Sequence, residues 1–409
     1  MSRAKLLMPV VALPLFALAP LLVASCADSD DANPHKEDAS SVVQPGSDAS
    51  STDASDAGVL PCDAGDPTCV SELLTCEEAD FCPVPSGVDP RYVLTAVWGS
   101  SASDVWAVGS GGTITHWDGA AWRSVPSGTR ETLNAVWGSS ASDVWVAGST
   151  ASILRSSGAA PWTNVPAFSD DVIAYHGRMH AVWGSSASDV RVGGQAFRGD
   201  LVEDETVVGS VEGNLLHTTT ADPGGSNLEV VSGLDGRWAQ ATVLAIWGTS
   251  SSDLWVSLDN GNEEPWARGT LAHGVASAPG EPLVWTPVDS KSNAPLESLW
   301  GSSANDVWAV GDRGEIRRFS GGTSFAVVDG VPTTESLHGV WGSGPKDVWV
   351  VGDAGTILHF DGATWTKATA AFPLGKKPDL RGVWGSGPND VWVVGDAFAL
   401  HFTGKKAGR

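Results

Sequence analysis

The chain has 409 residues, 42% of them apolar and 18% charged, and a formal net charge of −24 at pH 7. This composition excludes a fully disordered or collagen-like protein and leaves enough apolar residues to bury a large core. Acidic residues outnumber basic ones by 48 to 24, which excludes a nucleic acid as the expected partner. The aromatic usage is lopsided, with 20 Trp and only two Tyr, so the positions of the Trp carry most of the fold prediction.

Residues 1–26 have the features of a secretory signal. Two basic residues come first, an apolar run extends from Leu6 to Val23, and small residues precede Cys26. The alternative is a transmembrane anchor, but three Pro interrupt the run and a Cys closes it. We therefore expect residues 1–26 to be removed or processed at export.

The stretch Leu-Val-Ala-Ser-Cys at 22–26 resembles the bacterial lipoprotein signal, in which the Cys becomes the lipidated first residue of the mature protein. Ala27 stands where inner-membrane members of that family carry Asp. The resemblance implies lipidation of Cys26 and an outer-membrane lipoprotein of a Gram-negative bacterium, periplasmic or surface-exposed.

Residues 27–61 consist largely of Asp, Ser, Ala and Pro and offer little to bury, which predicts a disordered acidic tether. A flexible chain of that length reaches roughly 30–35 Å. The segment 62–82 then contains Cys62, Cys69, Cys76 and Cys82. In an exported protein four Cys predict two disulfides, with three connectivities open, and the alternative of a zinc site lacks the usual C-x2-C pairs.

A Trp-Gly repeat organises the rest of the chain. AVWGSSASDVWAVG at 96–109 returns as AVWGSSASDVWVAG at 135–148. Six of the seven copies carry a second Trp eight residues after the first, and the third copy has Arg191 there instead. The first Trp of the seven copies are Trp98, Trp137, Trp183, Trp247, Trp300, Trp341 and Trp384.

Each copy is expected to form four short strands, here named a to d. In the copy at 337–367, strands a (LHGVWG) and b (VWVVG) are apolar on both faces, and Asp361-Gly362 is a tight-hairpin signal between c and d. Strands buried on both faces must lie between other sheets. The prediction is an all-β, seven-bladed β-propeller of four-stranded antiparallel blades at 83–404, followed by a basic tail at 405–409, rather than a β-sandwich or a β-helix.

The chain ends favour the propeller. The last copy stops after strand c at 399–402, whereas residues 81–87 match the strand d and turn at 122–128. The last blade is therefore expected to be closed by an N-terminal strand, which leaves no strand edge unpaired at the junction.

An Asp precedes the second repeat position in every copy. We expect a structural role, in which the Asp accepts hydrogen bonds from nearby backbone amides and holds the turn between a and b; the alternative is a ring of calcium ligands. Strand c carries His116, His217, His359 and His401 at equivalent places, with Arg155 and Arg318 in other copies. Because strand c lies in the outer half of a blade, these side chains should be far apart, and no metal site is expected.

The W-G-S-[SG]-x-x-D-V-W-x-V-G repeat resembles the BNR-type propeller repeats of exported bacterial proteins over residues 81–404. Its likeness to the Asp-box is partial, because Asp361-Gly362-Ala363-Thr364-Trp365 keeps the turn and the Trp but not the spacing. Some propellers with such boxes are sialidases, with an arginine triad and a Tyr nucleophile. Here only Tyr92 and Tyr175 are available and the arginine pattern is missing, so the resemblance supports the fold far better than an enzyme.

Loop length separates the two faces of the expected ring. The a–b and c–d turns hardly vary, whereas the b–c and d–a connections, which share the other face, carry insertions at 195–212 and 258–268. We call this the variable face. Acids beside exposed aromatic residues suit a protein or glycan partner or a calcium-assisted contact. The candidate binding residues are Asp170, Asp171, Tyr175, His176, Arg178, Glu203, Asp204, Glu205, Asp259, Asn260, Glu263, Glu264 and Trp266.

The function expected from these features is that of a membrane-anchored, extracytoplasmic and non-catalytic binding or scaffold module, monomeric, that meets the membrane only through its lipid. The alternative is a glycan-active hydrolase or lyase of the BNR-propeller type, motivated by the resemblance and by paired acids such as Glu263 and Glu264. Adjacent residues on a strand point to opposite sides, which makes that pair a poor acid–base couple. No cofactor other than calcium is suggested, and no catalytic residue is assigned.

Overall fold

The chain divides into two units, residues 1–57 and 58–409, and everything described below belongs to the second. The computed structural model describes residues 66–150, 152–158, 161–165, 175–201, 207–218, 228–230, 234, 238, 241–260, 269–278 and 280–404. For 175–176, 196–201, 207–213 and 228–230 only the backbone is described. No helix in these ranges is long and apolar enough to cross a membrane.

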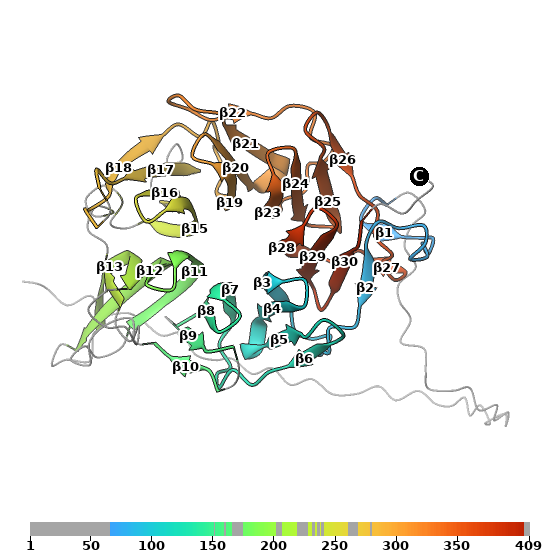
Figure 1. Ribbon diagram of the computed structural model, residues 1–409, viewed down its shortest axis with the longest axis horizontal. Helices are drawn as coiled ribbons and strands as arrows, with labels where there is room; N and C mark the ends of the chain where they lie inside the picture. Colours follow the sequence, from blue (N-terminus) through green and yellow to red (C-terminus); the bar gives the residue numbers. More distant parts are fainter. Residues whose placement is uncertain are drawn as a thin grey trace, which may run out of the picture. The chain divides into compact units, whose positions relative to one another are not determined.

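Seven four-stranded antiparallel sheets surround a common axis, with strand a of each blade innermost (Figure 1). The seven-bladed propeller predicted from the repeat is therefore confirmed. The first four blades consist of β3 (Leu94–Ser101), β4 (Asp104–Gly109), β5 (Ile114–Trp117) and β6 (Trp122–Ser124); β7 (Leu133–Ser140), β8 (Asp143–Gly148), β9 (Ile153–Ser156) and β10 (Thr163–Asn164); β11 (Tyr175–Ser186), β12 (Asp189–Leu201), β13 (Val207–Thr218) and β14 (Leu228–Val230); and β15 (Thr242–Ser250), β16 (Asp253–Asp259), β17 (Thr270–Val275) and β18 (Val284–Val288).

The last blade is closed by an N-terminal strand, as predicted. Strand β2 pairs with β30, with Cys82 opposite His401 and Val84 opposite Ala399. Two short 3-10 helices, η1 (Ser110–Gly112) and η4 (Asp312–Gly314), lie in b–c connections. Blades five to seven consist of β19 (Leu296–Ser303), β20 (Asp306–Gly311), β21 (Glu315–Phe319) and β22 (Ala326–Val327); β23 (Leu337–Gly344), β24 (Asp347–Gly352), β25 (Thr356–Phe360) and β26 (Trp365–Lys367); and β28 (Leu380–Gly387), β29 (Asp390–Gly395), β30 (Ala399–Phe402) and β2 (Cys82–Val84).

The Trp-Gly pair interlocks neighbouring blades. A Cβ added at Gly342 would lie 2.6 Å from the Trp300 ring of the preceding blade and 2.6 Å from the Asp347 carbonyl oxygen. The same contact recurs around the ring and closes it, since Gly99 of the first blade meets Trp384 of the last. The glycine is thus required because the first Trp of one blade occupies the space that a side chain would need on the next.

The second Trp fills the layer between blades farther from the axis. Trp308 is 1% exposed and packs edge-on against Trp365 of the following blade, with ring centroids 5.6 Å apart. Phe81, next to the closing strand, takes the same place against Trp349 at 5.3 Å. These contacts make the core a ring of apolar layers between sheets, as strands buried on both faces require.

The Asp of each repeat has a structural role, but its predicted partners were wrong. In the first blade Asp104 accepts from the Ser100 hydroxyl at 2.5 Å and pairs with His116 Nε2 at 2.6 Å, while the turn amide of Ser103 bonds to the Ser101 hydroxyl. The Asp therefore ties strand a to strand c. The pairs with strand c are Asp104–His116, Asp143–Arg155, Asp189–His217, Asp253–His273, Asp306–Arg318, Asp347–His359 and Asp390–His401.

These Ser-Asp-His sets resemble a catalytic triad in composition only. Ser100 donates to Asp104 and not to His116, so the hydroxyl lacks the imidazole base that activates the nucleophile of a triad. The imidazole instead stacks on the second Trp of its own blade, with centroids 4.1 Å apart for Trp106 and His116. The sets stabilise the blade, which explains why they recur.

The cysteine-rich segment is fastened to the ring. Cys76 and Cys82 form a disulfide with a Cα–Cα distance of 5.3 Å, and Cys69 is disulfide-bonded as well; Cys62 lies outside the described residues. Strand β1 (Cys69–Val70) pairs with β27 (Gly375–Lys376) at the sixth to seventh blade connection. The disulfide therefore ties Cys76 to the first residue of the closing strand β2.

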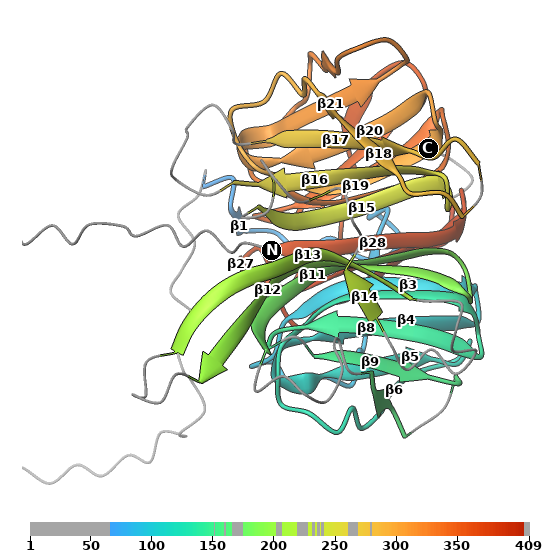
Figure 2. The same ribbon diagram turned by 90° about the vertical axis from the view of Figure 1, so that its left-hand side faces the viewer.

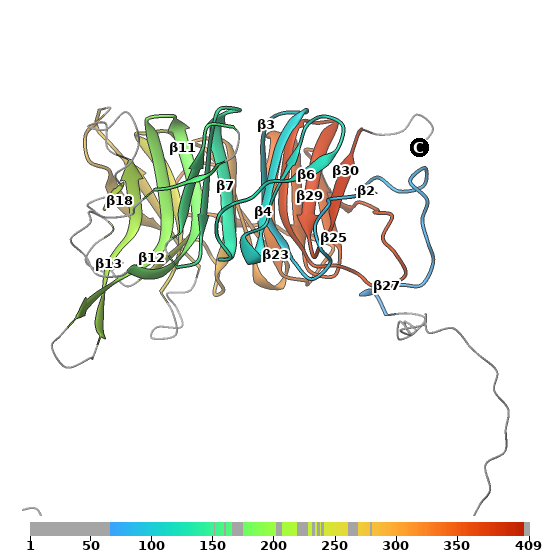
Figure 3. The ribbon, with the colours of Figure 1, turned by 90° about the horizontal axis from the view of Figure 1, so that it is seen from below.

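The insertion predicted as a loop at 195–212 is largely regular sheet. Strands β12 and β13 continue their pairing out to Leu201 opposite Val207, and the hairpin extends beyond the other blades (Figures 2 and 3). Extra hydrogen-bonded pairs make an ordered projection instead of a drifting loop. The residues between its two strands lie outside the described ranges.

Candidate functional site

The innermost strand of every blade contains a bulge at the same place. In β3 the pairing with β4 passes from Leu94 to Ala96 and leaves Thr95 out of register. A β-bulge changes the direction of a side chain and is common beside functional sites. The seven residues at this position, which we call the mouth ring, are Thr95, Asn134, His180, Leu244, Glu297, His338 and Arg381.

The mouth ring lines a cavity of about 230 Å³ between the seven innermost strands. Small or apolar neighbours on the same strands, such as Ala96 and Val97, complete its wall. Strand a begins at the variable face, and His338 bonds to Asp353 in a b–c connection. The cavity therefore opens among the connections that vary most from blade to blade.

This ring was missed in the sequence analysis although the sequence contains a signal for it. Strand a has an apolar residue four places before the first Trp, a small residue two places before it and an apolar residue one place before it, in all seven copies. Only the residue three places before the Trp changes in chemistry, from hydroxyl to amide, imidazole, alkyl, carboxylate and guanidinium. A position that varies within an otherwise constant buried strand indicates a role other than packing.

His338 is held between two carboxylates. Its Nδ1 lies 2.6 Å from Glu297 Oε2 and its Nε2 lies 2.7 Å from Asp353 Oδ1. Burial alone would lower the pKa of His338, but the hydrogen bonds and charges of Glu297 and Asp353 outweigh it and raise the pKa. An imidazolium that donates from both nitrogens has no lone pair for a metal or for proton abstraction. The role of His338 is therefore to hold Glu297 and Asp353 in place beside the cavity.

His180 has the opposite environment. Burial and then the charge of Arg178 lower its pKa to about 4, against weaker opposing effects of Glu297 and Asp259. The imidazole is therefore neutral at pH 7. It is half-buried and makes no hydrogen bond or ion pair with any described residue.

His338→Gln is expected to destabilise the propeller most at low pH. A His whose folded pKa is raised contributes stability that is fully present below its unfolded pKa of about 6.5 and is lost as pH rises through the folded value. The difference in unfolding free energy between wild type and the variant should therefore shrink as denaturation is measured at increasing pH from 5 to 9. If the difference in unfolding free energy instead grows with pH, the ion pairs of His338 with Glu297 and Asp353 do not stabilise the fold.

His180→Gln is expected to change the pH dependence of stability in the opposite direction to His338→Gln. Because its folded pKa of about 4 is below the unfolded value, wild-type His180 disfavours folding as pH falls from about 6.5 to 4. The variant should consequently be less acid-sensitive than wild type over that window.

The structure brings two predicted binding residues to the mouth ring. Arg178 lies two residues before His180 on β11, and Asp259 ends β16; both act on His180 through their charges. Asn260 instead donates its amide to the hydroxyl of Thr270, the first residue of β17 in the same blade, at 3.4 Å. Tyr175 and His176 lie on β11 with side chains outside the description. The other predicted residues, Asp170, Asp171, Glu203, Asp204, Glu205, Glu263, Glu264 and Trp266, lie outside the described residues.

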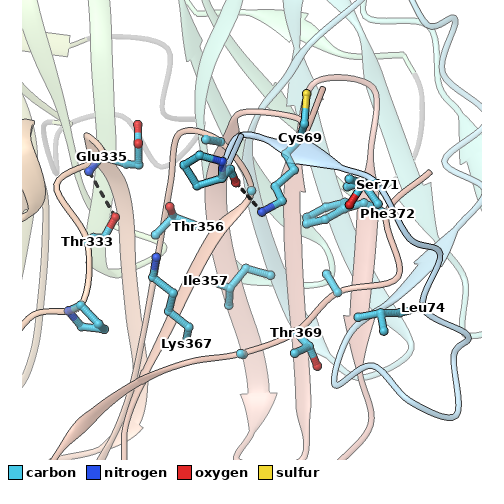
Figure 4. A pocket seen from close by; sticks show the side chains of 18 of the residues that line it. Cys69, Ser71, Leu74, Thr333, Glu335, Thr356, Ile357, Lys367, Thr369 and Phe372 are labelled. Atoms are coloured by element: carbon cyan, nitrogen blue, oxygen red, sulfur yellow. Dashed lines mark hydrogen bonds between the residues drawn. The ribbon is translucent and has the colours of Figure 1, made fainter. Parts of the chain in front are cut away.

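A second hollow, the outer cavity, lies between the cysteine-rich segment and the sixth blade. It has a volume of about 860 Å³, with Ile357 and Phe372 on an apolar floor and Lys367 and Glu335 at its polar rim (Figure 4). Lys377 Nζ donates to the Pro67 carbonyl at 2.6 Å and holds the segment in place. Repeat analysis could not predict this cavity, because one wall comes from outside the repeats.

Comparison with known proteins shows the fold. No family model matches, and no curated protein matches. The solved structures similar to this chain include "YCF48 bound to D1 peptide" (14% identity, 80% of this chain and 96% of that one, TM-score 0.55) and virginiamycin B lyase from Staphylococcus aureus (13%, 80% and 99%, 0.55). Another is the extracellular domain of the one-component system BT4673 from B. thetaiotaomicron (11%, 80% and 40%, 0.56). At these identities the likeness supports a seven-bladed β-propeller and no specific activity.

Proposed function

We propose that this chain is a non-catalytic binding propeller, anchored to the outer membrane through Cys26, that holds a segment of a protein partner at the mouth ring. The observation that carries the proposal is the bulge that turns one variable residue per blade into the same cavity. A fold that only needed packing would repeat that position as it repeats the rest of the strand. The lipid anchor and the outer-membrane location rest on the sequence pattern at 22–26.

Chemistry at the mouth favours a protein segment over a glycan. Among the described residues of the mouth ring, the side chains are polar, charged or alkyl, and none is the Trp, Tyr or Phe ring on which a sugar usually stacks. Similar propellers include one whose structure contains a bound peptide, which is compatible with this partner class. A cavity of about 230 Å³ is also smaller than the roughly 300–1,000 Å³ of sites for drug-sized ligands, so a single side chain or chain end fits it better than an oligosaccharide.

The test is site-specific photo-crosslinking in the producing cells. A photoreactive residue at Asn134, which is half-buried in the mouth, should give one discrete adduct with a protein. The same residue at Val284, 70% exposed on the outer strand β18, should not give that adduct. The proposal fails if the two positions give the same adducts, or if Asn134 gives none while the outer position does.

A deletion in the variable face tests whether the Asn134 adduct also depends on that face. Removing the hairpin residues 196–212, with a two-residue Asn-Gly turn in their place, shortens β12 and β13 without touching the mouth ring. If the partner also contacts the variable face, the Asn134 adduct should weaken while the melting temperature stays close to wild type.

A further inference from the structure

We infer that the mouth ring recognises a carboxylate of its protein partner, with Arg381 as the anchoring cation and His180 as a second donor. The inference rests on the proposed function and deepens it by naming the chemical group of the partner that enters the cavity lined by the mouth ring. It rests on a comparison of the described Lys, Arg and His side chains, most of which have a hydrogen-bond or ion-pair partner while Arg381 and His180 have none.

Arg381 is unusual among the cations of this protein. Of the described Lys and Arg side chains, six are at least half-buried, and five of these have a partner: Arg155, Arg191, Arg317, Arg318 and Lys377. Arg381 is half-buried and makes no hydrogen bond or ion pair with any described residue. A partly desolvated guanidinium without a partner is unfavourable, so its position in the cavity indicates a role with a ligand.

His180 repeats this pattern among the imidazoles. The other described His side chains each pair with a carboxylate, as His116 does with Asp104 and His338 with Glu297. His180 lines the same cavity as Arg381 and has no described partner. Among the described Lys, Arg and His side chains that are buried or half-buried, the two without a partner, Arg381 and His180, therefore line the same cavity.

Four carboxylates on the blades that carry His338 and Arg381, or beside them, already have other partners. Glu297 and Asp353 both pair with His338. Asp379 accepts from the Ala354 amide at 3.0 Å, and Asp396 accepts from the Asp379 amide at 3.1 Å. None of the four forms an ion pair with Arg381, so the guanidinium fork stays available for an incoming group.

The ligand chemistry follows from these donors. A planar guanidinium with two parallel N–H groups matches a carboxylate in a bidentate pair, and a neutral imidazole adds one N–H. The volume of about 230 Å³ admits one residue. The carboxylate is either the free end of the partner chain or an Asp or Glu side chain, and the experiment distinguishes the two.

The experiment titrates the intact propeller with three small probes and follows the Arg Nε–Hε NMR signals. The probes are N-acetyl-alanine, which carries a chain-end carboxylate, N-acetyl-glutamate α-amide, which carries a side-chain carboxylate, and N-acetyl-glutamine α-amide, its neutral analogue. The Arg381 signal, assigned by its loss in Arg381→Gln, should shift with at least one acid and not with the amide. The acid that binds more tightly identifies the source of the carboxylate.

Substitutions test the roles of the two donors. Arg381→Gln should weaken binding of the preferred acid by about tenfold or more, Arg381→Lys should retain part of it, and His180→Ala should weaken it a few-fold. Arg130→Gln is the matched control, because it removes the same charge at a residue that is exposed and has no described partner. Binding of the preferred acid to this variant should be unchanged. Equal binding of the amide and the acid, or wild-type affinity in Arg381→Gln with an unchanged melting temperature, would overturn the inference.

The two proposals fail separately. A partner crosslinked at Asn134 together with an Arg381 signal that no acid moves would leave the binding propeller standing and reject the carboxylate. Acid binding at Arg381 without a crosslinked partner would support the carboxylate site and reject the protein-binding role.

Discussion

Replacing Trp308 with Ala is expected to lower the free energy of unfolding by about 3–5 kcal/mol. The side chain is 1% exposed and packs against Phe360 and Trp365 of the next blade with centroids 5.3 and 5.6 Å away. Arg318 lies over the same ring at 4.5 Å. Its removal therefore opens a hole between two blades that neither sheet can fill, and takes a large part of the roughly 5–15 kcal/mol that stabilises a typical domain.

Denaturant unfolding of the disulfide-intact protein, followed by circular dichroism, measures this loss. Val284→Ala is the control, because Val284 is 70% exposed, and it should change the unfolding free energy by less than about 0.5 kcal/mol. Trp266, in the predicted binding loop, should also tolerate Ala. Comparable losses for Trp308→Ala and Trp266→Ala would mean that core and binding surface have been confused.

Gly342→Ala is the second change with a large expected effect. The added Cβ would lie 2.6 Å from the Asp347 carbonyl oxygen and 2.6 Å from the Trp300 ring, and a backbone atom cannot move aside as a flexible side chain can. Overpacking of this kind typically costs about 1–3 kcal/mol, and more where the backbone is involved. We expect at least about 3 kcal/mol.

The matched control lies two residues away on the same strand. Gly344 also belongs to β23, and a Cβ there would meet nothing within 4 Å. Gly344→Ala should leave stability unchanged or raise it slightly, because Ala loses less conformational freedom on folding. Thermal melts of both variants test the comparison; equal melting temperatures would show that the Trp-Gly interlock does not hold adjacent blades together.

The architecture was predictable because the repeat encodes contacts that every blade must make. The Trp-Gly spacing indicates seven copies, and the missing strand d after Phe402 matches the segment from Phe81 to Val84 that closes the ring. The reason for the glycine was not predictable, because the clash at Gly342 involves a Trp of another blade. The partners of Asp104 were missed for a different reason: His116 belongs to the neighbouring strand β5 and reaches Asp104 only when β4 and β5 pair.

The candidate site was predicted less well than the fold. Loop length pointed to the variable face, and Arg178 and Asp259 do lie near the mouth, but most of the predicted residues fall outside the described ranges. The mouth ring is built from one residue per blade, spaced about 40 to 60 positions apart, so no local motif marks it. His273 was likewise overlooked in strand c, because the insertion before it obscured the alignment of the fourth copy.

The most direct test of the account is where the partner lies on the ring. Hydrogen–deuterium exchange of the propeller, alone and with the protein captured at Asn134, measures this without altering any side chain. The account predicts protection in the first residues of the innermost strands, around 93–97, 178–182 and 379–383, and unchanged exchange in the outer strands β6 and β26. Protection confined to the outer strands or to the short turns of the opposite face would contradict it.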